Sequence, residues 1–283
     1  MSNVFLNGVW LPIEKATVSV LDRGFIFGDG VYEVIPVYHR RPYRMKPHLL
    51  RLQHSLNGIR IKNPYSDNEW VDLINKLISL QNFDDQSIYF QITRGVAPRA
   101  HNFPKDEVSP TVFMMSSPLK RSTKQQVEQG IRVVSAQDER WLHCNYKTIS
   151  LLGNILASQY ACDNDAMEVV QFRNGFLTEA SSSNVIIVQN GELVIPQKNH
   201  LILHGITMEV ITEIAQQEGI AVRYEDIPES AVRKADEILI TSSTKEVLAA
   251  TMLDDQPVGQ GVPGPVFKRL YTALQKDIFP ANE

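Results

Sequence analysis

Hydrophobic residues in the first third of the chain follow the two spacings that distinguish strands from helices. Apolar residues flank the pair Asn7-Gly8, which is typical of a tight hairpin turn, and they alternate with polar residues over 88–93. Apolar residues recur every three or four positions after Pro47, and again after a capping box that starts at Ser66. The pattern predicts a hairpin within 3–20, helices from 47 to 60 and 66 to 80, and strands at 88–93 and 111–115.

The polar stretch 117–124 interrupts this pattern, and the same two spacings return after it. We therefore predict an N-terminal domain of residues 1–120 and a C-terminal domain of residues 121–283. The pairs Asn174-Gly175 and Asn190-Gly191 predict hairpin turns in the second domain. Apolar runs predict its other elements, which are strands at 131–135, 168–172, 185–189, 192–195 and 237–241 and helices at 151–160, 206–218 and 266–274.

Composition and charge exclude several classes of protein. With 43% hydrophobic and 21% charged residues among 283, the chain is typical of a globular protein. Its net charge of −4 and its scattered basic residues predict no nucleic-acid surface. The sequence shows no long apolar run and no secretory signal, so we expect no membrane span and a cytoplasmic location. Cys144 and Cys162 are then expected to be reduced thiols, and no residues show the spacing of a metal site.

Lys147 is the strongest candidate for chemistry. It follows the aromatic residues Trp141 and Tyr146 and precedes the apolar run 151–157, so it is an isolated cation in an apolar stretch. It could be a lysine at the end of a strand whose amine reaches water. Alternatively, it could form a Schiff base, because desolvation makes a lysine amine nucleophilic.

The residues downstream favour the second interpretation. Glu179 lies in a hydroxyl-rich segment about thirty residues further on. Gly205 precedes a predicted helix, whose first amides would suit an anion, and Ser243 and Thr244 follow a predicted strand. Each turn alone could be an ordinary cap. A Schiff-base lysine, a carboxylate for a pyridine nitrogen and two phosphate-binding turns together are what pyridoxal 5'-phosphate requires.

Two further groups of polar residues have open interpretations. His48, Arg51 and Ser55 form a second stripe on the first predicted helix, which is either a solvated face or a platform from which Arg51 reaches a phosphate. Arg99 and His101 alternate in a proline-stiffened loop, so both point the same way if the loop is extended. They are either exposed surface side chains or a pair that grips a carboxylate.

The order of these motifs resembles the fold-type IV pyridoxal-phosphate enzymes from about Phe5 to the C-terminus. The motifs that carry the resemblance are Asp22-Arg23-Gly24-x-x-x-Gly28-Asp29-Gly30, His48-Leu49-x-Arg51-Leu52, Lys147 before Leu151-Leu152-Gly153-Asn154, Glu179-x-x-Ser182-x-Asn184, Gly205-Ile206-Thr207 and Thr241-Ser242-Ser243-Thr244-x-Glu246. Within that group, the stretch Arg94-Gly95-x-Ala97-Pro98-Arg99-Ala100-His101, together with Tyr32, is similar to the D-amino acid aminotransferases.

The resemblance implies a role for each candidate residue. Lys147 is implied to form the Schiff base with pyridoxal 5'-phosphate, and Glu179 to pair with the pyridine nitrogen. Tyr32, Arg99 and His101 are implied to hold the substrate carboxylate. The other implied cofactor-binding residues are Arg51, Ile206, Thr207, Ser243 and Thr244 around the phosphate, Leu203 beside the ring, and Ser182.

The resemblance also implies the fold and the reaction. The fold would be α+β, with two α/β domains and the cofactor between them. The reaction would be transamination between a D-amino acid, such as D-alanine, and a 2-oxo acid, such as 2-oxoglutarate, in a homodimer whose active site is completed by the neighbouring subunit. The alternatives are a branched-chain L-amino acid aminotransferase, an aminodeoxychorismate lyase of the same fold and a cofactor-binding protein without catalytic activity.

Overall fold

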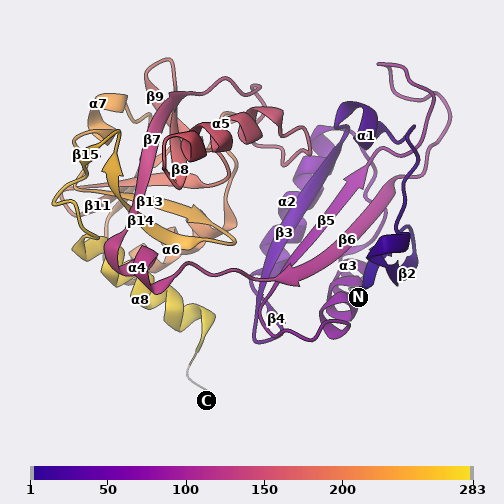
Figure 1. Cartoon of the computed structure of the whole chain (residues 1–283), viewed down its shortest axis with the longest axis horizontal. Coiled ribbons are helices and arrows are strands. Elements are labelled where there is room, and N and C mark those ends of the chain that lie inside the picture. The colour runs from indigo at the N-terminus through magenta and orange to yellow at the C-terminus, as the bar shows by residue number, and fades with distance from the viewer. Residues whose placement is uncertain (1–2, 281–283) are drawn as a thin grey trace. The chain divides into compact units, whose positions relative to one another are not determined.

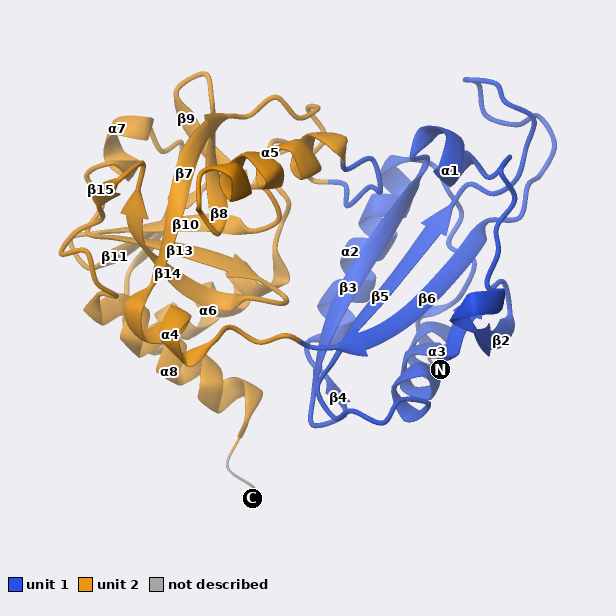
Figure 2. Cartoon of the chain, in the orientation of Figure 1, with its two compact units in different colours: residues 1–119, 146–151 blue, residues 120–145, 152–283 orange. Residues whose placement is uncertain are grey.

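The computed structural model of the protein describes residues 3–280, and the chain divides into two compact units (Figures 1 and 2). Unit 1 consists of Met1–Leu119 and Tyr146–Leu151, and unit 2 of Lys120–Asn145 and Leu152–Glu283. The predicted division between residues 120 and 121 differs from this grouping in two respects. Lys120 belongs to unit 2, and the short segment Tyr146–Leu151, which carries Lys147, packs within unit 1 rather than with its neighbours in the sequence.

Unit 1 is built on an antiparallel sheet of six strands in the order β2-β1-β6-β5-β3-β4 (Figure 1). Leu52 and Leu56 of α2 and Trp70 of α3 are fully buried in the core beside the sheet residues Ile35 and Phe90. The elements of unit 1 are β1 (Asn3–Leu6), β2 (Val9–Pro12), a 3-10 turn (Ile13–Lys15), α1 (Arg23–Phe27), β3 (Gly30–Tyr38), β4 (Arg41–Pro42), α2 (Met45–Gly58), α3 (Asp67–Ser79), β5 (Gln86–Thr93) and β6 (Thr111–Pro118).

Three predictions for unit 1 are confirmed. Asn7 and Gly8 have positive φ angles of 49° and 90°, as a two-residue hairpin requires, although β2 ends at Pro12. The capping box is present between Ser66 and Glu69 at the start of α3. The apolar stripe of α2 faces the core, although the helix begins at Met45, two residues before the predicted start.

Segment 146–151 is fixed along the first residues of β3. The amide of Tyr32 donates to the carbonyl oxygen of Lys147 at 2.9 Å, and the amide of Ile149 donates to the carbonyl of Gly30 at 3.1 Å. Thr148 forms an antiparallel bridge with Val31. The backbone of Lys147 is therefore held by a strand of unit 1, and this strand also carries Tyr32.

Unit 2 contains a mixed sheet of nine strands, with the order β12-β11-β10-β13-β14-β7-β8-β9 and β15 beside β14. Strand β7 lies parallel to both β14 and β8, whereas β10 and β13 are antiparallel neighbours. The elements are α4 (Lys124–Gln129), β7 (Ile131–Gln137), α5 (Leu152–Asp163), β8 (Glu168–Arg173), β9 (Phe176–Ala180), β10 (Asn184–Gln189), β11 (Glu192–Pro196), α6 (Ile206–Gln217), β12 (Val222–Glu225), α7 (Glu229–Val232), β13 (Glu237–Ser242), β14 (Glu246–Leu253), β15 (Gln256–Pro257) and α8 (Pro265–Ile278).

The hairpin predictions for unit 2 are also confirmed. Asn174-Gly175 joins β8 to β9 and Asn190-Gly191 joins β10 to β11, and all four residues have positive φ. In the part of the chain that the structure describes, no helix is long and apolar enough to cross a membrane. Cys144 is buried and Cys162 is exposed, and both are free thiols.

Candidate active site

Lys147 lies beside Tyr32 in unit 1. Its backbone amide donates to Ser55 Oγ of α2 at 3.0 Å, and its Nζ is 4.3 Å from the centre of the Tyr32 ring. The ring of Tyr32 in turn lies 5.7 Å from that of Tyr89. The lysine side chain is half-buried, so its amine is placed against an aromatic face rather than extended freely into water.

Arg51 forms a buried ion pair with Glu33. Its Nε donates to Glu33 Oε1 at 2.7 Å and its Nη2 donates to Oε2 at 2.8 Å. His48 Nδ1 lies 2.9 Å from the same Oε2. All three side chains are at most 9% exposed, so the second stripe of α2 is not a solvated face.

The ionisation of this group follows from its surroundings. Burial alone would raise the pKa of Glu33, but the Arg51 guanidinium and the hydrogen bonds from Arg51 and His48 hold that pKa well below its usual range. Burial lowers the pKa of His48 below 6.5, so the imidazole is neutral at pH 7 and Nδ1–H is the donor to Glu33. Glu33 is therefore a carboxylate that fixes the direction of the Arg51 side chain.

Arg99 and His101 contact the same aromatic ring. The Cζ of Arg99 is 5.4 Å from the centre of the Phe27 ring, and the imidazole of His101 is 5.6 Å from it. Both side chains are otherwise exposed. The expectation that the two residues point the same way agrees with this shared contact.

Two buried arginines hold the loop that carries this pair. Arg23 and Arg94 each donate from Nε to Asp29 Oδ2 at 2.8 Å. Arg23 also donates to the carbonyl oxygen of Ala100, which lies between Arg99 and His101 in the sequence. The guanidinium of Arg94 lies 3.7 Å from the centre of the Phe103 ring. The loop is therefore attached to the start of β3 through the Asp29 carboxylate.

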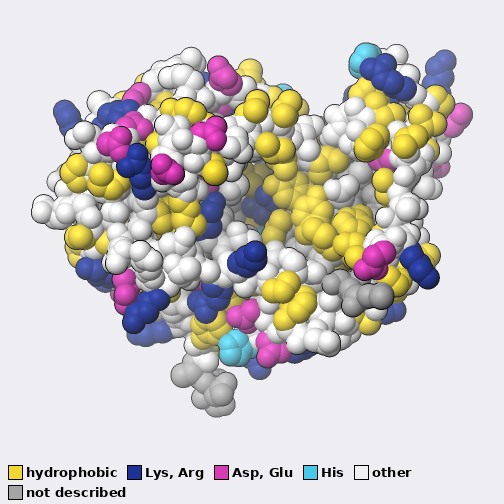
Figure 3. Space-filling model, viewed as in Figure 1, with side chains coloured by type: hydrophobic (Ala, Val, Ile, Leu, Met, Phe, Trp, Pro, Cys, Tyr) yellow, Lys and Arg dark blue, Asp and Glu magenta, His cyan; other side chains and the backbone are white. Residues whose placement is uncertain are grey.

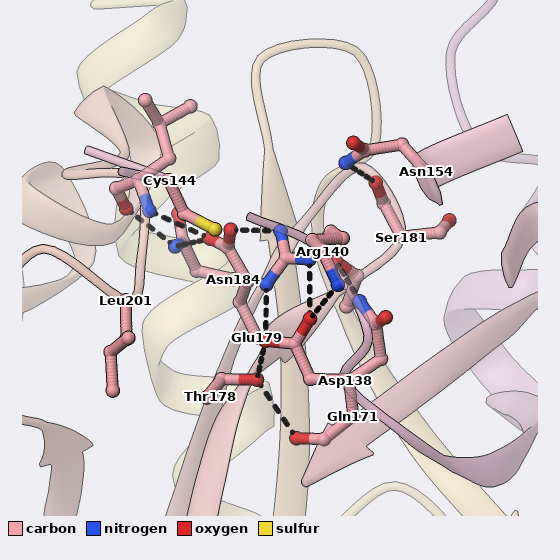
Figure 4. A network of polar contacts seen from close by, with 12 residues as sticks. Asp138, Arg140, Cys144, Asn154, Gln171, Thr178, Glu179, Ser181, Asn184 and Leu201 are labelled. Atoms are coloured by element: carbon pink, nitrogen blue, oxygen red, sulfur yellow. Dashed lines mark hydrogen bonds and ion pairs between the residues drawn. The ribbon is translucent and has the colours of Figure 1, made fainter. Parts of the chain in front are cut away.

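Glu179 in unit 2 is a buried carboxylate surrounded by donors (Figure 4). Its Oε1 accepts from Arg140 Nη1, and its Oε2 accepts from the Leu203 amide at 2.9 Å and from Asn184 Nδ2 at 3.1 Å. Asn184 also donates to the Leu203 carbonyl at 2.7 Å. A Cβ on Gly205 would lie 1.9 Å from Asn184 Oδ1, so a glycine is required where Asn184 packs against this backbone.

Arg140 is shared between Glu179 and Asp138, as Figure 4 shows. It donates from Nε and Nη2 to the two oxygens of Asp138, both at 2.9 Å. Burial would raise the pKa of Asp138, but Arg140 and the Thr178 hydroxyl lower it below its usual value. Burial also raises the pKa of Glu179, against the opposing effects of Arg140 and the Leu203 amide.

The remaining candidates of unit 2 lie at the ends of secondary-structure elements. Ile206 and Thr207 are the first residues of α6, and its N-cap, Gly205, has no side chain that could accept from their amides. Ser182 lies between β9 and β10, and Ser243 and Thr244 lie between β13 and β14. Lys245 Nζ lies 3.2 Å from Ser182 Oγ and so connects the last two turns.

The sequence interpretation missed the residues that support the candidates. Glu33 behind Arg51, Arg140 behind Glu179 and Glu168 behind Ser182 were not assigned a role. Glu33 is a charged residue inside the largely apolar strand β3, which is a signal that could have identified it, and Glu168 directly precedes the apolar pair Val169-Val170 at the start of β8. Among residues 3–280, no group of three or more histidine, cysteine, aspartate or glutamate side chains could hold a metal ion.

Comparison with known proteins identifies the family. The model of the family described as amino-transferase class IV matches residues 30–253. The chain is 36% identical to a D-alanine aminotransferase of Staphylococcus haemolyticus over 98% of both chains, and 34% identical to that of Bacillus licheniformis over 97% of this chain and 96% of the relative. A branched-chain amino acid aminotransferase of Escherichia coli has the same fold, with a TM-score of 0.94 and 24% identity over 100% of this chain and 96% of that chain.

The chain therefore belongs to the class IV aminotransferases. It is a transaminase that depends on pyridoxal 5'-phosphate, and its fold-type IV, α+β architecture is confirmed by these relatives. The residues present fit the cofactor. Glu179 is a buried carboxylate, Lys147 is an amine beside an aromatic ring, and α6 offers uncapped amides to an anion.

We expect Glu33→Gln to destabilise the apoprotein by about 3–5 kcal/mol at pH 7, because the substitution leaves the Arg51 guanidinium buried without its anion. The pKa of Glu33 is lower in the folded protein than its ordinary value of 4.5. Its stabilising effect is therefore complete above about pH 4.5 and is lost as the pH falls. The difference in unfolding free energy between wild type and Glu33→Gln should shrink below pH 4.5.

Urea denaturation at a series of pH values between 7 and 3 measures this difference. Glu128→Gln is the matched control, because Glu128 forms only an exposed ion pair with Lys124. If Glu33→Gln loses no more stability at pH 7 than this control, the buried pair does not have the proposed structural role.

Proposed function

We propose that the protein transfers the amino group of a D-amino acid, with D-alanine as the preferred donor, to a 2-oxo acid such as 2-oxoglutarate. The observation that carries this proposal is the pair of Arg99 and His101 on one aromatic ring, which offers a guanidinium and an imidazole to a carboxylate. The relatives named D-alanine aminotransferases, which match almost the whole chain, support the substrate class.

Lys147 has two roles in this proposal. Pyridoxal 5'-phosphate supplies the electron sink that makes the Cα–H bond of a bound amino acid acidic. The Nζ of Lys147 would hold the cofactor covalently until the substrate amine takes its place. The free amine of Lys147 would then accept the proton from the substrate Cα and donate it again within the same site. The contact with the Tyr32 ring restricts the amine to one position, from which it serves one face of the substrate.

Glu179 is assigned to the ring nitrogen of the cofactor. Its carboxylate would keep that nitrogen protonated, and Arg140, Asn184 and the Leu203 amide fix its orientation. Leu203 would support the ring itself. These residues hold charge in place and need not move during the reaction.

The phosphate is assigned to polar groups from several elements. The amides of Ile206 and Thr207 offer donors at the positive end of α6, and the hydroxyls of Ser182, Ser243 and Thr244 offer additional donors. Arg51 adds a guanidinium whose direction is set by Glu33. These contacts would retain the cofactor when Lys147 releases it.

Tyr32, Arg99 and His101 are assigned to the substrate carboxylate. Tyr32 contacts Lys147, whereas Arg99 and His101, which belong to the exposed loop, contact Phe27 of α1. This separation into two contact groups supports a site in which one chain supplies Lys147 and Tyr32 and a second copy supplies the loop.

A second copy is also supported by the surface of α5. Leu152, Ile155, Leu156 and Tyr160 are all exposed and lie on one face of this helix. Hydrophobic side chains are visible at the surface over α5 in Figure 3. An apolar stripe of this length is typical of an interface, so we propose a homodimer that buries α5. We also propose a cytoplasmic location, in which Cys144 and Cys162, both free, would stay reduced.

A branched-chain L-amino acid aminotransferase is the second candidate function. The observation in its favour is the close agreement of the fold with the Escherichia coli enzyme of that name. Because the identity is only 24%, this agreement concerns the fold, and the two functions differ in the enantiomer that they accept.

The first test of the proposed function is to locate the covalent link and the substrate. We expect borohydride reduction of the holoenzyme to fix the cofactor on Lys147, and Lys147→Ala to abolish transamination. Titration with D-alanine should shift the absorbance of the bound cofactor at concentrations at which L-alanine and L-leucine have little effect. Attachment at Lys46, Lys76 or Lys245 would contradict the assignment, and a response to L-leucine alone would favour the second candidate.

The next expectation concerns Arg99. We expect Arg99→Ala to raise the KM for D-alanine strongly, because the loss of a charged hydrogen-bond pair costs about 2–5 kcal/mol. Arg99→Lys should restore only part of this loss, since an ammonium cannot form two parallel bonds. Preference for D- over L-alanine should also decrease. Steady-state kinetics with both enantiomers measure these effects, and Lys105→Ala in the same exposed loop is the control.

The homodimer has its own test. We expect wild type to sediment at twice the chain mass of 32.0 kDa, and Leu156→Asp to shift the protein toward the monomer because the new charge would be buried at the interface. Val262→Asp, another exposed apolar position in unit 2, should leave the mass unchanged.

A shared active site predicts complementation as well. If one chain supplies Lys147 and its partner supplies Arg99, inactive Lys147→Ala chains and Arg99→Ala chains, refolded together and assayed at D-alanine concentrations too low to saturate Arg99→Ala, should form mixed dimers with one intact site. A 1:1 mixture should then recover about a quarter of the wild-type activity. A mixture without activity, from chains that are dimeric, would place both residues in a site of one chain.

A further inference from the structure

Glu168 is a buried carboxylate that the proposed chemistry does not use. It is the first residue of β8, and only 1% of its surface is exposed. Its Oε1 accepts from its neighbour, the Val169 amide, at 3.0 Å, and from the amide of Ser181 at 3.1 Å. Burying a carboxylate is costly unless its oxygens accept hydrogen bonds, so the burial of Glu168 needs an explanation.

All three hydroxyls of the turn between β9 and β10 point to this carboxylate. Ser181 donates its hydroxyl to Oε1, and Ser183 and Ser182 donate theirs to Oε2 at 2.9 Å and 3.4 Å. The turn is therefore wrapped around Glu168, and its shape depends on that carboxylate. Ser182, which we assign to the cofactor, is the least tightly bound of the three.

Lys245 completes the arrangement from the other turn. Its Nζ lies 2.7 Å from Glu168 Oε2, 3.0 Å from Ser183 Oγ and 3.2 Å from Ser182 Oγ. Its backbone amide donates to the hydroxyl of Ser242 at 3.1 Å. Burial would raise the pKa of Glu168, but the Lys245 ammonium and the Ser181 hydroxyl lower it, so the pair is ionised at neutral pH.

The two turns lie at neighbouring strand ends. Asn184, the first residue of β10, is paired with Thr241, near the end of the antiparallel strand β13. The turn before β10 and the turn after β13 therefore lie next to each other at the same end of these two strands. The ion pair between Lys245 and Glu168 joins them by side chains where the backbone hydrogen bonds of the sheet end.

We propose that Lys245 and Glu168 are positioning residues that hold the two hydroxyl-bearing turns at the spacing required by the cofactor phosphate. This inference rests on the proposed assignment of Ser182, Ser243 and Thr244 to that phosphate.

The physical basis is preorganisation. Turns that are already held at the correct spacing lose little conformational freedom when the phosphate binds, so more of the interaction energy appears as affinity. Without Lys245, the serine turn would keep its bonds to Glu168, and the backbone of the second turn would keep its bonds to Ser242 and Ser122, but the ammonium that joins the two turns would be lost. The phosphate would then have to hold the two turns at the correct spacing, and affinity should fall.

The test compares Lys245→Met with wild type by the dissociation constants of two ligands. Pyridoxal 5'-phosphate carries the phosphate, and pyridoxal is the same ring without it. We expect Lys245→Met to raise the dissociation constant of pyridoxal 5'-phosphate about tenfold or more, and that of pyridoxal by less than about twofold. Lys245→Arg should restore most of the affinity, because arginine keeps a cation opposite Glu168.

The comparison needs two controls. Lys124→Met removes a lysine from an exposed ion pair of the same unit and should change neither constant. Thermal unfolding of each apoprotein shows whether the variant is folded. Because the Lys245 side chain is 20% exposed, methionine fits the position, and Lys245→Gln is the second variant if Lys245→Met does not fold.

The outcomes separate this inference from the proposed function. Equal losses for both ligands would indicate a general loosening of unit 2 and would overturn the inference, as would unchanged constants. If wild type itself binds the two ligands equally well, the assignment of the turns to the phosphate is wrong, and the inference fails with it. Cofactor attachment at Lys147 would be unaffected by either result.

Discussion

The organisation of both units depends on the cost of burying a carboxylate. Glu33, Glu168 and Glu179 are each at most 5% exposed, and each is paired with a cation. An unpaired carboxylate in such a position would lose its charge or prevent folding, so its partner must come from another segment of the chain. The cations are Arg51 on α2, Lys245 after β13 and Arg140 after β7. These pairs fix the geometry of the segments that carry the proposed site.

The sequence predicted the elements whose signal is local. Asn-Gly pairs gave the hairpins, and the capping box at Ser66 gave the start of α3, because these motifs act within a few residues. The sequence did not predict β14, whose run Val247 to Ala250 is apolar throughout and is compatible with a strand or a buried helix. Nor could it predict that Tyr146–Leu151 pairs with β3, because that pairing joins residues more than a hundred positions apart.

The candidate site was predictable to the same extent. Motif resemblance identified the residues assigned to the cofactor, whereas Glu33, which follows Tyr32 in β3, was given no role. The supporting partners were not predicted, since a lone Glu33 or Glu168 in a sequence does not reveal which cation it meets. The candidate residues could be predicted and their partners could not, for a physical reason. A residue type shows which chemistry a side chain can perform, but its ionisation and its direction depend on residues that are distant in the sequence.

The most consequential of these neighbours is Arg140. Its guanidinium gives two hydrogen bonds to Asp138 and one to Glu179, so it is shared by two buried carboxylates. Asp138 also pairs with Arg173 at 3.1 Å. Asp138 accepts more of the hydrogen bonds of Arg140, and its pKa is lowered, whereas the pKa of Glu179 is raised. Glu179 is thus a carboxylate whose charge is only partly compensated within the protein. Under the proposed assignment, a protonated ring nitrogen would supply the missing positive charge. Arg140, Asn184 and the Leu203 amide already fix the orientation of Glu179 for that partner.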